Sequence, residues 1–214
     1  NPDGITWVLY SIAYNHLGRG HVDSATVYLD MASEVNYKIG NKIFECELLI
    51  SKHLANYLKG EKSLDLLEKA ASIAKEISAD ELYLKTQAQI GNIHLYNQKY
   101  EKALEQLKPW IDWLIENDTD ISLDDMANYL VCLKALGKEY DLSELKKLIK
   151  NTPEYKIDYS TNYSLYKILE DTKYLKDAYD LIMKLKSNLE TEVSETFIKY
   201  PLVNEIVQSY KNIS

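Results

Sequence analysis

The stretch Leu84–Trp110, LKTQAQIGNIHLYNQKYEKALEQLKPW, contains the pattern on which the fold prediction rests. An apolar residue, Ile90, stands directly before a small one, Gly91, and a second small residue, Ala103, follows Ile90 after 13 residues. Leu107 then follows Ala103 by one helical turn. On two antiparallel helices these spacings place small residues where the backbones come closest, with bulky residues beside them on the same face. The stretch therefore predicts a helical hairpin.

The same 13-residue spacing recurs along the chain. It joins Ile12 to Ala25, Ile50 to Ser63, Leu130 to Ser143 and Leu165 to Ala178. The second residue is small in every case, and successive starts are 38, 40, 40 and 35 residues apart. Tight turns are expected within the pairs at Gly20, Lys59-Gly60 and Asn97-Gln98. We therefore predict five consecutive helix pairs, each with a small residue at its close contact.

This pattern resembles the tetratricopeptide repeat (TPR), which runs W-x2-L-G-x2-Y, then A-x3-F, then P. The third unit is the most similar, and the first and second units follow it through Gly20–Ala32 and Ser63–Ala71. The fourth and fifth units depart from the pattern at Val131, Lys134, Lys147 and Tyr166. The resemblance implies an all-α, right-handed superhelix of about five antiparallel helix pairs. Its long period is similar to that of regulatory arms in bacterial signalling proteins.

Helix boundaries follow from the apolar periodicity and from the sparse breakers, 7 Gly and 4 Pro. The ten expected helices are Ile5–Gly18, Val22–Ile39, Lys42–Leu58, Lys62–Ile77, Asp80–Asn97, Tyr100–Asn117, Leu123–Leu136, Leu142–Lys150, Tyr159–Thr172 and Tyr174–Leu189. They group into repeat units of about 5–40, 42–78, 80–117, 122–151 and 158–190 within a single domain, residues 1–214. Ser122 is expected to cap the seventh helix.

The tail, residues 191–214, is predicted to be a C-terminal capping helix interrupted at Tyr200-Pro201. Phe197, Leu202 and Ile206 recur at roughly helical spacing, so that one apolar stripe can face the fifth pair. A helical array needs such an element to cover its last apolar face. The alternative is a tail that binds a partner.

Charge and cysteine content limit the classes of partner and compartment. The net charge is −8, from 25 Lys+Arg against 33 Asp+Glu, which argues against binding to nucleic acid or to anionic membranes. No apolar run approaches the roughly 18 residues of a membrane span, and no signal peptide is evident. Cys46 and Cys132 are predicted to be free buried thiols rather than disulfide or reactive cysteines, which favours a cytoplasmic location. Because the sequence begins at Asn1, we expect it to be part of a longer protein.

Catalytic and metal-binding patterns are missing from the sequence. The four histidines form no metal-ligand pair, and His16 and His94 occupy the same place in the repeat, where packing between helices is expected. There is no glycine-rich phosphate loop and no nucleophile elbow. We therefore expect a noncatalytic protein with no metal and no cofactor.

The first helices of the pairs are expected to line a concave groove, through residues that the helix contacts do not use. The predicted groove residues are Trp7, Tyr10, Tyr14, Lys52, Asn56, Lys85, Asn92, Tyr96, Asn128 and Tyr129, and the fifth pair adds Tyr163, Lys167 and Glu170. Side chains that combine apolar area with hydrogen-bonding tips suit a bound peptide or helix. The alternative is that tyrosine replaces phenylalanine in the core, since the chain has 18 Tyr and 2 Phe.

These features favour a protein–protein interaction module, the regulatory or scaffold arm of a larger signalling protein, which binds a protein or peptide partner. A second hypothesis is a domain that senses a small ligand or signal peptide and changes its curvature. Binding to chaperone tails is not predicted, because a carboxylate clamp of the TPR type needs an arginine and the chain has only Arg19.

Overall fold

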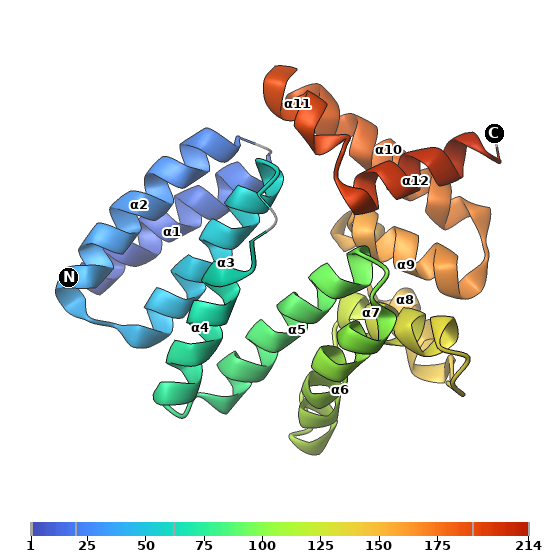
Figure 1. Ribbon diagram of the computed structural model, residues 1–214, viewed down its shortest axis with the longest axis horizontal. Coiled ribbons are helices and arrows are strands. Elements are labelled where there is room, and N and C mark those ends of the chain that lie inside the picture. The colour runs from blue at the N-terminus through green and yellow to red at the C-terminus, as the bar shows by residue number, and fades with distance from the viewer. Residues whose placement is uncertain (1, 20, 62, 190, 214) are drawn as a thin grey trace. The chain divides into compact units, whose positions relative to one another are not determined.

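The computed structural model describes residues 2–19, 21–61, 63–189 and 191–213, and every regular element within them is a helix (Figure 1). The α-helices are α1 (Pro2–Gly18), α2 (Val22–Ile39), α3 (Lys42–Leu58), α4 (Asp65–Glu76), α5 (Asp80–Tyr96), α6 (Tyr100–Glu116), α7 (Leu123–Ala135), α8 (Ser143–Asn151), α9 (Tyr159–Leu169), α10 (Thr172–Asn188), α11 (Thr191–Phe197) and α12 (Pro201–Lys211), with a short 3-10 helix, η1, at Glu154–Lys156. Consecutive helices pack in pairs, as predicted. Gly20 and Lys62, where a turn and a helix start were expected, lie outside the described residues.

The chain folds into two compact units, which are described separately. The first comprises Asn1–Thr86 and Leu185–Ile198, and the second comprises Gln87–Lys184 and Lys199–Ser214. Their boundaries fall inside α5 and α10, so that neither unit is one continuous stretch of chain. The expectation of a single domain stays a prediction.

The first unit is held together by an apolar core between α1, α2 and α3, and α1 and α2 lie side by side in Figure 1. Ala13 of α1 and Ala25 of α2 are both fully buried in this core. Their small side chains allow the helices to approach closely, and Leu29 fills the next turn of α2. The small residue predicted at the close contact of the first pair is therefore correct.

The third pair shows the same close contact in the second unit. A Cβ atom added to Gly91 would lie 3.0 Å from the Leu107 Cγ and 3.2 Å from the Ala103 carbonyl oxygen. Ala103 and Leu107 are both fully buried. Only glycine therefore fits at position 91 without displacing α6, which is the contact that the opening stretch predicts.

The predicted close contacts of the second and fourth pairs are wrong. Ser63 and Ser143 are exposed, and Ser63 precedes α4, where its hydroxyl accepts a hydrogen bond from the Asp65 backbone nitrogen at 3.1 Å. The connections at 59–64 and 136–142 are at least twice as long as the one at 97–99. The second helix of these pairs therefore begins later, and a fixed 13-residue spacing falls short of it.

Two local predictions about α7 have clear outcomes. Ser122 caps this helix, since its hydroxyl accepts a hydrogen bond from the Asp125 backbone nitrogen at 3.3 Å.

Lys134, which departs from the repeat pattern, has a specific role at the end of α9. Its ammonium donates hydrogen bonds to the carbonyl oxygens of Lys167 and Ile168, at 2.9 and 3.0 Å, and to the Glu170 carboxylate. A cation at a helix C-terminus satisfies carbonyl groups that the helix leaves open.

The tail divides between the two units. Val193 of α11 packs against the apolar core of α1–α3, whereas α12 belongs to the second unit. Phe197 belongs to the first unit and Leu202 and Ile206 to the second, and all three side chains are buried. A new helix begins at Pro201, between Phe197 and the other two residues, and the expectation that the three form one stripe facing the fifth pair stays a prediction.

Candidate interaction surfaces

The predicted groove residues of α1 form an aromatic row, which we call the α1 aromatic face (Trp7, Tyr10, Tyr14 and Phe44). Trp7 and Tyr10 pack edge-on against Phe44 of α3, with ring centroids 5.6 and 5.4 Å apart, and Tyr14 stacks on Tyr10 at 6.3 Å. Phe44 is buried, yet Trp7 and Tyr14 are 58% and 62% exposed. Two large rings are thus held in place by their neighbours and still present their surface to solvent.

The α1 aromatic face is also tied to α3 by a polar contact. The Ser51 hydroxyl donates a hydrogen bond to the Tyr10 hydroxyl at 3.4 Å. Burial raises the pKa of Tyr10, and the nearby Glu47 carboxylate acts in the same direction. Tyr10 therefore stays a neutral phenol that positions the two exposed rings beside it.

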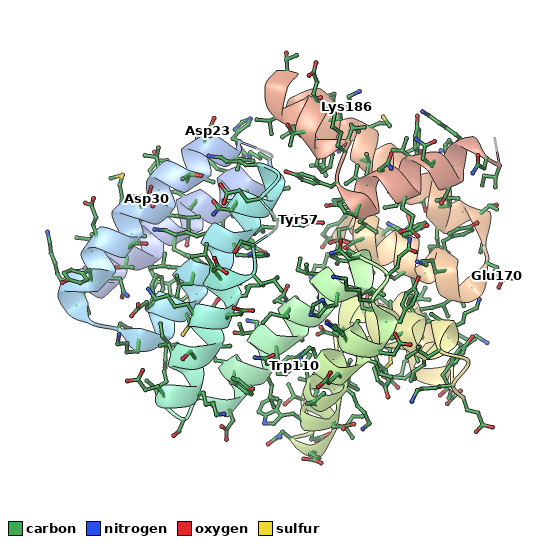
Figure 2. The ribbon with its side chains drawn as sticks, viewed as in Figure 1. Asp23, Asp30, Tyr57, Trp110, Glu170 and Lys186 are labelled. Carbon is green, nitrogen blue, oxygen red and sulfur yellow. The ribbon has the colours of Figure 1, made fainter. Side chains whose placement is uncertain are left out.

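The predicted lysines of the first unit are engaged in ion pairs. The Lys52 ammonium lies 2.8 Å from the carboxylate of Asp30, which projects from α2 in Figure 2. The Lys85 ammonium lies 3.8 Å from the Glu47 carboxylate. Asn56 is half-buried near the end of α3. Lys52 therefore points towards α2 rather than along the row of aromatic rings on α1.

The predicted groove asparagines Asn92 and Asn128 are buried and bonded to each other. The Asn128 amide donates to the Asn92 side-chain oxygen at 3.0 Å, and the Ser164 hydroxyl donates to the Asn128 side-chain oxygen at 2.7 Å. The three residues come from α5, α7 and α9, at successive intervals of 36 residues. We call them the polar ladder. Their role in binding stays a prediction, and in this structure their polar tips face one another.

Tyr96 and Tyr129, the remaining predicted groove residues, lie half-buried on α5 and α7. Neither ring is as accessible as Trp7 or Tyr14. Of the ten predicted residues, the structure brings together the three from α1 and, separately, the two asparagines of the polar ladder.

A second polar arrangement, the lysine–tyrosine site (Tyr100, Tyr163, Lys167, Glu205 and Ser209), lies where α12 meets α9. The Tyr163 hydroxyl donates to one Glu205 carboxylate oxygen at 2.9 Å, and the Lys167 ammonium donates to the same oxygen at 3.2 Å. The Lys167 ammonium also lies over the rings of Tyr100 and Tyr163, 5.6 and 5.4 Å from their centroids. Two cation–π contacts and two hydrogen bonds therefore converge on one ion pair.

Burial keeps Tyr163 in its neutral form. Tyr163 is 4% exposed, and its burial raises its pKa far above the ordinary value for tyrosine. Its single hydroxyl proton goes to Glu205, so the Ser209 hydroxyl, 3.1 Å away, is the donor to Tyr163. Sequence reasoning included Tyr163 and Lys167 but missed Glu205 and Ser209. The sequence does not single them out, since Asn204 and Gln208 are also polar and four apart but are exposed.

The two cysteine thiols and the His53 imidazole are buried, and burial favours the neutral form of each group. Cys46 and Cys132 are free and buried, as predicted, and burial raises the pKa of Cys132 to about 12. Burial lowers the pKa of His53, which is stacked on Tyr57 of the same helix. A thiol of such high pKa is a poor nucleophile. Within the described ranges no three His, Cys, Asp or Glu side chains are grouped so as to hold a metal ion.

An open pocket of about 470 Å³ lies in the second unit, between α8, η1, α9 and α10. Apolar side chains from Ile149 and Ile157 form part of its lining, and Lys173 and Asp177 contribute charge. The Lys173 ammonium pairs with the Glu154 carboxylate at 3.2 Å. The volume is in the range of small-molecule sites.

No protein-family model, curated protein or solved structure matches this chain. Among the described helices, none is long and apolar enough to cross a membrane.

Proposed function

We propose that this chain is a noncatalytic protein–protein interaction module, the regulatory or scaffold arm of a larger signalling protein. In this proposal its helix pairs form a right-handed, TPR-like superhelix, and the groove along the first helices binds a peptide or helix. The proposed location is cytoplasmic.

The observation that supports the proposal is the exposure of Trp7 and Tyr14 on the α1 aromatic face. Large aromatic side chains that remain exposed and held in place are typical of binding hot spots, because they lose little conformational entropy when a partner covers them. Ile5 and Val8, at 53% and 59% exposed, extend the apolar surface on the same helix. The surface offers area and hydrogen-bonding tips without a reactive group, which fits binding better than catalysis.

The test begins with selection of binding peptides from a random library displayed on phage, using the whole chain as bait. Affinities of the selected peptides are then measured for the parent chain and for Trp7→Ala and Tyr14→Ala. We expect each substitution to weaken binding at least 10-fold, as truncation of a hot-spot aromatic does. Tyr37→Ala is the matched control, since its ring is exposed on α2. Equal losses for all three variants, or none, would contradict the assignment of the binding face to α1.

The second candidate function, sensing of a small ligand or signal peptide, is favoured by the pocket between α8 and α10. Its volume and its mixture of apolar and charged lining suit a small molecule. Calorimetry with a small-molecule library is the direct test. A ligand whose binding is lost in Lys173→Ala but kept in Trp7→Ala would assign the function to this pocket instead.

A further inference from the structure

The lysine–tyrosine site joins the last helix of the chain to the helices beneath it by unusually specific contacts. Glu205 and Ser209 stand four residues apart on one face of α12, and both reach the Tyr163 hydroxyl. One turn of helix away, Tyr210 stacks on Tyr179 of α10 with ring centroids 4.3 Å apart. The face of α9 and α10 therefore distinguishes a carboxylate, a hydroxyl and an aromatic ring along one helix.

A helix that served only as a cap would need the apolar stripe and a polar exterior. Its stripe is present, since Leu202, Val203, Ile206 and Val207 are buried, and Asn204 and Gln208 are exposed. The ion pair between Lys167 and Glu205 adds little net stability, because both groups exchange hydration for one another. The pair is half-buried, and a charge pair at such a contact selects a partner more than it strengthens the contact.

The tail is also attached in a way that allows α12 to leave. It has 11 residues, and an isolated helix of this length is marginal in water, so its helical state depends on docking. Residues 198–200 connect it to α11, which belongs to the other unit. When α12 undocks, the Lys167 ammonium and the Glu205 carboxylate can both regain water, which lowers the free energy needed to open the site.

From these contacts we infer that the face formed by α9, α10 and Tyr100 is a helix-binding surface, and that α12 is its internal ligand. The partner that replaces α12 is an amphipathic helix with one carboxylate at the edge of its apolar stripe and an aromatic residue five positions later, as Glu205 and Tyr210 are placed. This surface uses other helices than the α1 aromatic face. Substitutions at Trp7 therefore test the proposed function, and substitutions at Glu205 test this inference.

The experiment uses the whole chain and a fluorescent peptide with the sequence of residues 200–213. Glu205→Lys in the chain places a second cation beside Lys167 and releases α12, whereas Asn204→Lys adds the same side chain on the exposed side. We expect the peptide to bind the Glu205→Lys chain at least 10-fold more tightly than the parent or the Asn204→Lys chain. A peptide with Gln in place of Glu205 should bind the released site at least 10-fold more weakly.

Two outcomes would overturn the inference. The first is a Glu205→Lys chain that keeps the parent's helix content and melting midpoint but binds no peptide at 1 mM. The second is equal binding of the Glu and Gln peptides, which would leave only an apolar contact. Should Glu205→Lys fail to fold, hydrogen exchange on the parent chain decides. Exchange in α12 at least 10-fold faster than in α9 and α10 supports a detachable ligand, and equal protection of the three helices refutes it.

Discussion

The helices α1 and α12 differ in what covers their apolar residues. On α1, Trp7 and Tyr14 remain more than half exposed although neighbouring rings hold them in place. On α12, the apolar residues Leu202 and Ile206 are buried, and its polar residues are divided between a half-buried carboxylate contact and an exposed exterior. The apolar residues of α1 therefore remain an open surface, whereas those of α12 are covered by packing.

The two units also differ in how their first helices meet. The core of α1–α3 is apolar and is built from small residues such as Ala13 and Ala25. In the second unit, α5, α7 and α9 meet through the polar ladder of Asn92, Asn128 and Ser164. Apolar contacts tolerate a shift of register more readily than buried hydrogen bonds do, because a shifted amide loses its partner. The polar ladder therefore fixes the register of the second unit more strictly.

Removal of tail segments is expected to have the largest effect on stability, and two different truncations are expected to affect different units. A chain ending at Lys199 lacks α12 and uncovers α9 and α10. Four buried apolar side chains are lost, at about 1.5–3 kcal/mol each before chain entropy is subtracted. A chain ending at Leu189 also lacks Val193, which packs on α1–α3. Hydrogen exchange should therefore accelerate in α9 and α10 for the first chain, and in α1–α3 only for the second. Equal exchange in α1–α3 for both would mean that α11 contributes nothing to the first unit.

Truncation at the centre of the polar ladder is expected to have the next largest effect. Asn128→Ala removes the shared partner of Asn92 and Ser164 and leaves a cavity, so we expect the free energy of unfolding to fall by about 2–4 kcal/mol. Urea denaturation measures this loss. Ser164→Ala removes one hydrogen bond and should cost about 1 kcal/mol. The comparison between units would fail if both substitutions had equal, small effects.

The sequence predicted the helices and their pairing because apolar periodicity and breakers act locally. The close contact at Gly91 and Ala103 was also predictable, since small residues at that spacing have few other uses. The register between pairs was not. The repeat spacing made Leu130 the equivalent of Ile90, which stands 40 residues earlier. The polar ladder instead joins residues that are 36 apart. This difference is about one helical turn, and it places Ala127, not Val131, at the position of Gly91. Helix periodicity repeats at every turn, so it cannot decide between registers that differ by one turn.

The candidate surfaces were predictable only in part, for a related reason. Exposure of Trp7 and Tyr14 depends on which neighbour covers α1, and that is a property of tertiary packing. Asn92 and Asn128 have side chains suited to a binding groove, but their amides are hydrogen-bonded to each other. Lys134 looked like a departure from the repeat, because the carbonyl groups that it caps lie 33 and 34 residues away in α9. Which polar residues bond over such distances depends on tertiary packing, which the periodicity within one helix does not report.

Enlarging the small residue at a helix contact is the finest test of where the two helices of a pair meet. Ala103→Leu inserts three methylene-sized groups between α6 and Gly91, and we expect it to lower the free energy of unfolding by about 1–3 kcal/mol. Ser143→Leu is the matched control, because the 13-residue spacing gives Ser143 the same role while the structure leaves it exposed. A surface substitution of this kind changes stability by about 0.5 kcal/mol or less. If urea denaturation showed that Ser143→Leu lowers the free energy of unfolding as much as Ala103→Leu does, the fixed 13-residue spacing would be correct after all. A melt in which only Ala103→Leu shifted would show that connection length, and not residue size alone, decides where the second helix makes its close contact.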